Sequence, residues 1–189
     1  FTGQTLPGLV TELSVVIDNA NPETIEVKPA DQTPPEITVV SPESKDYPRS
    51  ATTTIDVDVN DADSGVFSQE IRFDDRIVNN GDVIDPFFKK LGGHILTATA
   101  TDFVGNTATS TVEFRIVATV ESTISDVERA YTLGWIDKQS TRNGLVFKLE
   151  KVIGKEPTAK NLKSFIHQLE REHPKHINDQ AYNLLKEDV

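Results

Sequence analysis

The sequence predicts an antiparallel β-sandwich followed by a small all-α helical bundle. Residues 33–119 alternate apolar and polar side chains in short runs separated by Pro, Gly, Asn and Asp, which is typical of half-buried strands. Residues 120–189 repeat apolar side chains every three or four positions, the period of amphipathic helices. A chain of 189 residues is long enough for two small modules, each with its own core.

Residues 1–32 have the least definite pattern. Leu6, Leu9 and Leu13 fit a helical stripe, whereas "LSVVI" at 13–17 fits a strand equally well, and both interpretations stay open. The following "KPADQTPPE" predicts a linker, because Pro34 and Pro35 favour extended backbone. We expect residues 1–32 to be the tail of a preceding domain with its linker. The chain contains no Met, so we expect Phe1 to lie inside a longer precursor.

Five segments supply the predicted strands of the sandwich: "EITVV", "TTTIDVDVN", "QEIRFDD", "HILTATATD" and "TSTVEFRIV". In the second of them Ile55, Val57 and Val59 share one face, while acids occupy the other, so we expect the aliphatic face in the core and the acidic face in water. The segment "VNNGDV" at 78–83 predicts a hairpin turn, since Asn and Gly adopt positive φ at low cost.

Four amphipathic segments supply the predicted helices, with apolar stripes over 124–135, 145–152, 162–169 and 181–185. Thr158 and Asn178 are expected N-caps, and Gly154 and the pair His173-Pro174 are expected to end the helices before them. A bundle of about 70 residues has only a marginal core, so we expect it to pack on the sandwich.

Composition excludes several classes of function. The formal net charge is -11, and residues 1–120 carry 8 basic and 19 acidic side chains against 11 of each in 121–189. An acidic surface repels phosphate backbones, so nucleic acid is not an expected partner. No apolar run reaches the roughly 20 residues that span a bilayer, so we expect no membrane span. The absence of Cys excludes disulfides, thiolate ligands and a cysteine nucleophile.

The order of the segments "PPEITVVSPESKDYP", "IDVDVNDADSGV", "EIRFDD" and "GGHILTATATDFVGNTATSTVEFRIV" resembles the bacterial immunoglobulin-like modules of secreted and surface proteins. The resemblance covers residues 34–118. It implies that Asp102 to Asn106 form the hairpin between the last two strands, with Asp102 bonded to its own turn. It also implies that His94 makes a structural hydrogen bond, akin to a tyrosine corner.

The same resemblance places the loops 61–65 and 102–106 at one end of the sandwich. Asp61, Asp63, Asp102 and Asn106 would then gather, and their oxygens could supply part of a calcium site. We favour turn-forming roles for these residues, with calcium as the alternative cofactor; no other cofactor is expected. The segment "DVDVNDADSG" is not an EF-hand, because its first acids belong to a strand.

The region after residue 132 is similar to the helical modules called FIMAH domains that close many secreted bacterial enzymes. The matching features are Gly-Trp-Ile at 134–136, "GLVFKLEKV", "LKSFIHQLE" and "HINDQAYNLL". Such modules have no catalytic residues, and the other histidines, His167, His173 and His176, lack the spacing of a helical zinc site.

These observations predict a non-catalytic accessory region at the C-terminal end of a larger secreted or cell-surface bacterial protein, with an upstream catalytic domain, an extracellular hydrolase or lyase. The first alternative is a module that binds carbohydrate or cell wall through loop aromatics, with Phe88 and Phe103 as ligand-binding residues and with Phe67 and Phe87 also near loops. The least favoured alternative is a hydrolase acting through Asp61, Asp63 and Asp102.

Overall fold

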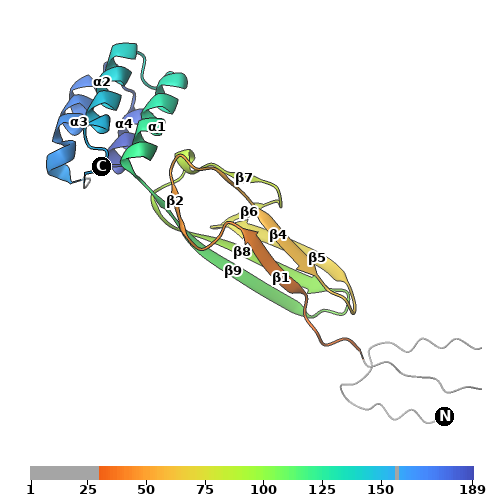
Figure 1. The fold of residues 1–189 in the computed structure, drawn as a ribbon. Helices are drawn as coiled ribbons and strands as arrows, with labels where there is room; N and C mark the ends of the chain where they lie inside the picture. Colours follow the sequence, from red (N-terminus) through yellow and green to blue (C-terminus); the bar gives the residue numbers. More distant parts are fainter. Residues whose placement is uncertain (1–29, 156–157) are drawn as a thin grey trace, which may run out of the picture.

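The computed structural model describes residues 30–155 and 158–189. The expectations for residues 1–29 lie outside this range. The described chain is elongated, with a β-sandwich at one end and four helices at the other (Figure 1). None of the described helices has the length and apolar character needed to cross a bilayer. The elements are β1 (Glu36–Ser41), β2 (Asp46–Pro48), β3 (Thr53–Thr54), β4 (Asp56–Asn60), β5 (Val66–Phe73), β6 (Arg76–Val78), β7 (Val83–Ile84), the short 3₁₀ helix η1 (Pro86–Phe88), β8 (Gly92–Asp102), β9 (Thr107–Val117), α1 (Val120–Thr132), α2 (Gln139–Glu150), α3 (Ala159–Glu172) and α4 (Asp179–Glu187).

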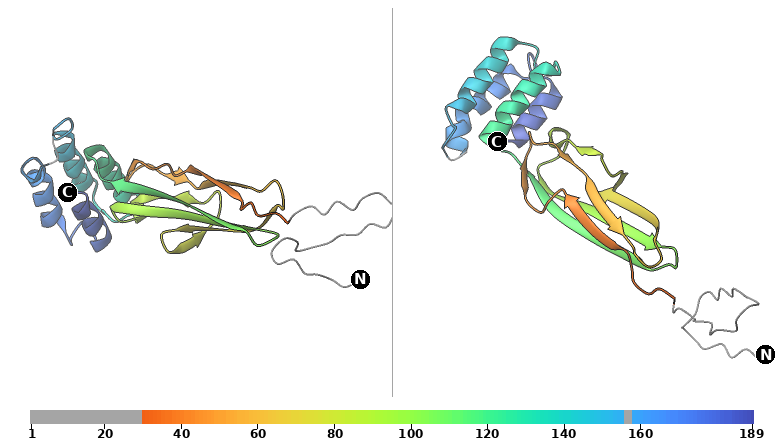
Figure 2. Two further views of the ribbon diagram at one scale, coloured as in Figure 1. Left: turned by 90° about the horizontal axis from the view of Figure 1, so that it is seen from below. Right: turned by 45° about the vertical axis from the view of Figure 1, so that its right-hand side comes forward.

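The sandwich has a five-stranded sheet in the order β2-β9-β8-β5-β6, covered on one face by the antiparallel pair β1–β4, as Figure 2 shows from two further sides. A third, two-stranded sheet joins β3 to β7. Alternation explains the layers. Ile55, directly before β4, and Val57 of β4 pack in one core with Leu96 and Phe114 of the larger sheet, whereas Asp56 and Asp58 point to solvent. The predicted β-sandwich and its core are confirmed.

Two details of the predicted sandwich are corrected. The segment 78–83 is not a hairpin, because β6 pairs with β5 while β7 pairs with β3, so the turn at Gly81 carries the chain from one sheet to another. The sheet is also not wholly antiparallel, since β2 lies parallel to β9. Neither long-range pairing leaves a signal in local alternation.

The outer face of the β8–β9 hairpin carries pairs of threonines. Thr97 faces Thr111, Thr99 faces Thr109 and Thr101 faces Thr107, and each pair has its hydroxyl oxygens within 3.4 Å of each other. Cross-strand Thr pairs of this kind stabilise a ladder from its solvent side.

The helical bundle closes around its own apolar cluster, which includes Leu145, Leu149, Phe165, Leu169 and Leu185. The predicted caps are confirmed: the Thr158 hydroxyl accepts a hydrogen bond from the Asn161 backbone N–H, and the Asn178 side chain accepts one from Ala181. α3 ends at Glu172, directly before the predicted stop at His173-Pro174.

The two modules meet without a long linker, since β9 ends at Val117 and α1 begins at Val120. Arg129 of α1 forms an ion pair with Asp85 of the sandwich, and Trp135 stacks on Phe87 with ring centroids 5.4 Å apart. Phe87 is 1% exposed, which corrects its expected place among the exposed loop aromatics.

Arg49, which follows β2, is the second link between the modules. Its side chain is only 1% exposed. It donates hydrogen bonds to the carbonyls of Leu184 in α4 and Lys89 in the sandwich, and it forms ion pairs with Glu187 and Asp188. A buried guanidinium with partners from both modules ties them into one unit.

Candidate functional site

The loops at the end of the sandwich away from the helices bring three carboxylates together. One carboxylate oxygen from each of Asp31, Asp61 and Asp102 lies within 4.8 Å of the other two. The resemblance predicted that Asp61 and Asp102 meet, and they do, because the backbone N–H of Phe103 bonds to the carbonyl of Gly65 and joins the two loops. Asp31 was missed, because it lies in a segment predicted to be a linker.

Asp61 organises its own loop. Its Oδ1 accepts hydrogen bonds from the backbone N–H groups of Asp63, Ser64 and Gly65, at 2.8 to 3.2 Å. Gly65 ends this loop directly before β5 with φ +79, a left-handed conformation that Gly adopts at low cost. Asp63 is exposed and lies outside the cluster of Asp31, Asp61 and Asp102, so it does not join the other aspartates of the predicted calcium site.

Asp102 closes the β8–β9 turn in the way expected for an Asx turn. Its Oδ1 accepts from the backbone N–H groups of Val104 and Asn106, and its Oδ2 accepts from the Asn106 side-chain amide at 2.7 Å. Burial acts to raise the pKa of Asp102, but the hydrogen bonds from Asn106, Ser64 and Val104 together hold that pKa below its usual value. Both oxygens are therefore occupied by donors, and the carboxyl stays ionised.

Asn106 and Asp31 complete the cluster. The side-chain amide of Asn106 donates hydrogen bonds to the Asp102 carboxylate and to the carbonyl of Asp31. The Ser64 hydroxyl donates to Asp31 at 2.7 Å, and this bond lowers the pKa of Asp31. Donors thus offset the repulsion among the three carboxylates. The arrangement fastens the chain at residue 31 to two sandwich loops. Calcium binding by these oxygens stays the alternative interpretation.

Two members of the cluster lack the property of a general acid. A general acid needs a carboxyl that keeps its proton near neutral pH. Asp31 and Asp102 have lowered pKa values, which is the opposite shift.

The two aromatic candidates lie at opposite ends of the sandwich. Phe103, in the turn after β8, is 68% exposed and makes an edge-to-face pair with Phe67 of β5, which is 66% exposed. Phe88, in η1, is 58% exposed but contacts Phe87 and Trp135 at the junction with the helices. The structure therefore does not combine Phe88 and Phe103 into one binding surface.

Three of the four histidines form hydrogen bonds with carboxylates. His94 lies 3.0 Å from the Asp74 carboxylate and 2.9 Å from the carbonyl of Lys90, and its ring stacks on Phe73 and Phe114, so the expected structural hydrogen bond is confirmed. His173 bonds to Asp179, and His176 bonds to Asp137. His173 and His176 thus bind different carboxylates and do not share a ligand.

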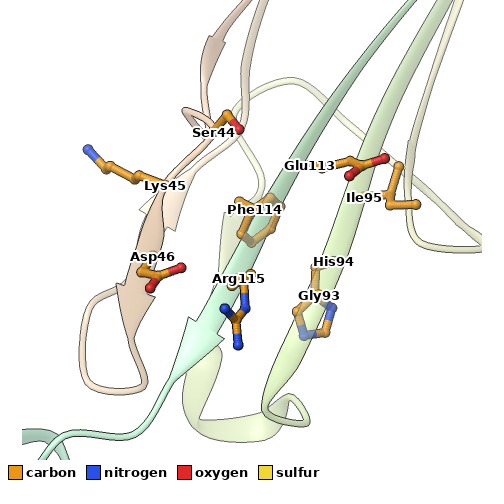
Figure 3. Close-up of a pocket in the computed structure, with 9 residues that line it drawn as sticks. All are labelled: Ser44, Lys45, Asp46, Gly93, His94, Ile95, Glu113, Phe114 and Arg115. Atoms are coloured by element: carbon orange, nitrogen blue, oxygen red, sulfur yellow. The ribbon is translucent and has the colours of Figure 1, made fainter.

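The outer face of the sheet has a hollow of about 580 Å³ between β2, β8 and β9 (Figure 3). Gly93 leaves space there, because nothing lies within 4 Å of the position of a Cβ atom. The rim carries Lys45 and Arg115 together with Asp46 and Glu113, so its formal charges balance. Its two aromatic rings, His94 and Phe114, are buried, so the hollow lacks a stacking surface for a sugar.

No protein-family model and no curated protein matches the chain. Solved structures are similar over part of it, including the following two. The endo-beta-1,4-mannanase from Thermotoga petrophila aligns at 13% identity and a TM-score of 0.38, covering 47% of this chain and 21% of that one. The fibronectin(III)-like modules of Clostridium thermocellum CbhA align at 13% identity and a TM-score of 0.36, covering 44% of this chain and 46% of that one. The chain spans less than half the length of either structure.

Proposed function

We propose that the chain is a non-catalytic accessory region of a larger secreted or cell-surface bacterial protein. In this proposal the sandwich is a spacer and the helical bundle is an interaction module. The protein's catalytic domain, an extracellular hydrolase or lyase, lies upstream in the same polypeptide.

The observation that carries this proposal is the fixed junction between the modules. Arg49 and Arg129 each bind acceptors on the other module, and Trp135 stacks on Phe87. A spacer that sets both distance and orientation requires such contacts, because modules without a substantial interface move independently. The carboxylate cluster at the opposite end fastens the incoming chain at Asp31, so both ends of the sandwich are anchored.

The proposal is tested on the complete parent protein with and without residues 30–189. We expect turnover of a small soluble substrate to be unchanged and retention on the cell surface or on polymeric substrate to be lost. Arg129→Ala in the complete protein tests whether function needs a rigid junction or only the presence of both modules. Arg76→Ala, which replaces an exposed arginine of β6, is the matched control. Loss of turnover on the soluble substrate upon deletion would contradict a non-catalytic role.

A second candidate function is carbohydrate or cell-wall binding, and the exposed pair Phe67–Phe103 favours it. Each of the two rings is about two-thirds exposed, and the pair lies next to the three carboxylates. Apolar surface therefore lies beside hydrogen-bond acceptors. Sugar sites combine these two features.

Binding of the intact chain to a panel of insoluble and soluble polysaccharides tests this candidate. Phe103→Ala is expected to abolish any binding, whereas Phe147→Ala, at an exposed aromatic of α2, is expected to retain it. Equal binding by both variants, or none by the unchanged chain, removes this candidate and leaves the accessory proposal standing.

A further inference from the structure

The junction between the modules encloses more carboxyl groups than cations. Besides Arg49, it contains Asp126 of α1, which is 1% exposed, and Asp188, which follows α4 and whose side chain is 0% exposed. Glu187 is half exposed and binds both Arg49 and the backbone N–H of Leu91. Arg129 is already matched by the two hydrogen bonds that it donates to Asp85.

Three of the four oxygens of these two buried carboxyls lack a hydrogen-bond donor if both groups are ionised. Nη1 of Arg49 lies 2.9 Å from Oδ1 of Asp188, yet no donor among the described residues is aligned in a hydrogen bond with either carboxylate oxygen of Asp188 or with Oδ2 of Asp126. An ionised carboxylate can only accept hydrogen bonds. A hydrogen bond between these two side chains therefore exists only when one of them keeps a proton.

The balance of charges also indicates that one of the two carboxyls keeps a proton. Within the enclosed group, Arg49 faces Glu187, Asp126 and Asp188, so full ionisation leaves two uncompensated negative charges, both at buried positions. An unpaired buried charge is costly, and such a group takes up a proton instead.

We propose that Asp126 and Asp188 share one proton between α1 and the end of α4, and that loss of this proton with rising pH weakens the attachment of the bundle to the sandwich. The inference goes beyond the accessory function and does not depend on it. It concerns how the contact between the modules responds to pH.

The groups that face the pair support this assignment. Burial raises the pKa of Asp126 to about 6 against the opposing effect of Arg49, and burial raises the pKa of Asp188 to about 8 against that same arginine. The other charged groups around the pair are Arg129, Asp85 and Glu187. A carboxyl whose pKa is raised on folding stabilises the fold below that pKa and loses this contribution as the pH increases. The affected window runs from the ordinary value of 3.8 up to about 8.

The position of α4 explains why deprotonation acts on the junction. Arg49 holds the end of this helix through the carbonyl of Leu184 and through both Glu187 and Asp188. A second charge on the carboxyl pair would repel Asp188 from Asp126 and draw the end of α4 out of its place beside Arg49. A cavity of about 100 Å³ adjoins Asp188, so space for hydration lies next to the pair.

The first measurement needs no substitution. Side-chain carboxyl ¹³C resonances of the unchanged protein are followed by NMR from acidic to alkaline pH. We expect the Asp126 and Asp188 carbons to titrate above the ordinary aspartate value of 3.8, and to report on each other's titration. Titration of both near 3.8 would overturn the proposal.

The second measurement uses Trp135, the single Trp of the chain, which stacks on Phe87 at the junction. Acrylamide quenching of its fluorescence is expected to increase between about pH 5 and about pH 9 in the unchanged protein, because the junction loosens. Asp188→Asn supplies a permanent N–H donor to Asp126 and is expected to abolish this increase. Asp58→Asn, at an exposed acid of β4, is the matched control and is expected to keep it. An equal increase in Asp188→Asn and in the control would overturn the proposal.

Discussion

Arg129 donates two parallel hydrogen bonds to Asp85, from Nη1 to Oδ1 at 2.9 Å and from Nη2 to Oδ2 at 2.5 Å. The same guanidinium lies 4.4 Å from the centre of the Phe87 ring. One side chain of α1 thus binds an acid and an aromatic ring of the sandwich. Only the planar guanidinium matches both partners.

Arg129→Lys is expected to destabilise the protein by about 1 kcal/mol, because an ammonium group cannot replace the paired hydrogen bonds and the pair is partly exposed. Urea unfolding monitored by Trp135 fluorescence measures the change. Arg76→Lys on the exposed edge strand β6 serves as the control and is expected to leave the midpoint unchanged. An unchanged midpoint for Arg129→Lys would show that the two hydrogen bonds add no stability.

Arg49→Met is expected to be the most damaging single change, with a loss of about 3–5 kcal/mol near neutral pH, because it leaves buried carboxyls without a counter-ion. The loss is expected to be smaller near pH 5 than near pH 8, since the raised pKa values of Asp126 and Asp188 mean that both carboxyls gain protons on the acidic side. Thermal unfolding at both pH values measures the difference. An equal loss at both would contradict the proton-dependent charge balance.

Asp102→Ala is expected to lower the melting temperature by several degrees, because the backbone N–H groups of Val104 and Asn106 lose their acceptor. Asp102 has a lowered pKa, so its contribution is present above the ordinary value of 3.8 and disappears as the pH falls through the lower folded value. Calorimetry at neutral and strongly acidic pH should show the variant and the parent converging in acid. Asp63→Ala, an exposed acid of the neighbouring loop, should match the parent at both.

Calcium is expected to leave the melting temperature unchanged, because Oδ1 of Asp61 and both oxygens of Asp102 already accept hydrogen bonds from the protein. A ligand that binds the folded state would raise the melting temperature. Calorimetry with calcium chloride and with a chelator decides this point. A calcium-dependent rise that disappears in Asp61→Asn would replace the turn interpretation with a metal site.

Gly144→Ala is expected to destabilise the bundle despite the better helix propensity of Ala, which is worth about 1 kcal/mol. The added Cβ would lie 2.5 Å from the Gln168 Nε2 atom, and Gln168 is buried and hydrogen-bonded to the carbonyl of Thr141. In the background of Gln168→Ala the same change should become stabilising. Chemical unfolding of the two single variants and the double variant measures this coupling; additive effects would contradict it.

The sequence predicted the layers of the fold because those layers follow from local periodicity. The alternation around Ile55 and the capping residues Thr158 and Asn178 each act over a few positions, and the structure confirms them. The parallel pairing of β2 with β9 and the crossing at Gly81 depend on partners far along the chain, and no local pattern encodes such partners.

The site residues were predicted in part for the same reason. The meeting of Asp61 and Asp102 followed from the resemblance, which supplied the arrangement of the loops. Asp31 and Arg49 were missed, since each acts across more than 30 positions and lies among residues that read as linker or loop. Asp126 carried a usable signal, because it lies beside Val127 and four positions before Ala130, within the buried stripe of α1.

Because both modules enclose Arg49, the sandwich and the helical bundle are expected to be inherited together. A sandwich cut after residue 119 would expose the Arg49 guanidinium without its partners at the end of α4. A bundle cut before residue 120 would keep Asp126, Glu187 and Asp188 but lack Arg49 as their cation. Recombination between genes could therefore transfer the pair to a new host protein far more readily than it could transfer either half.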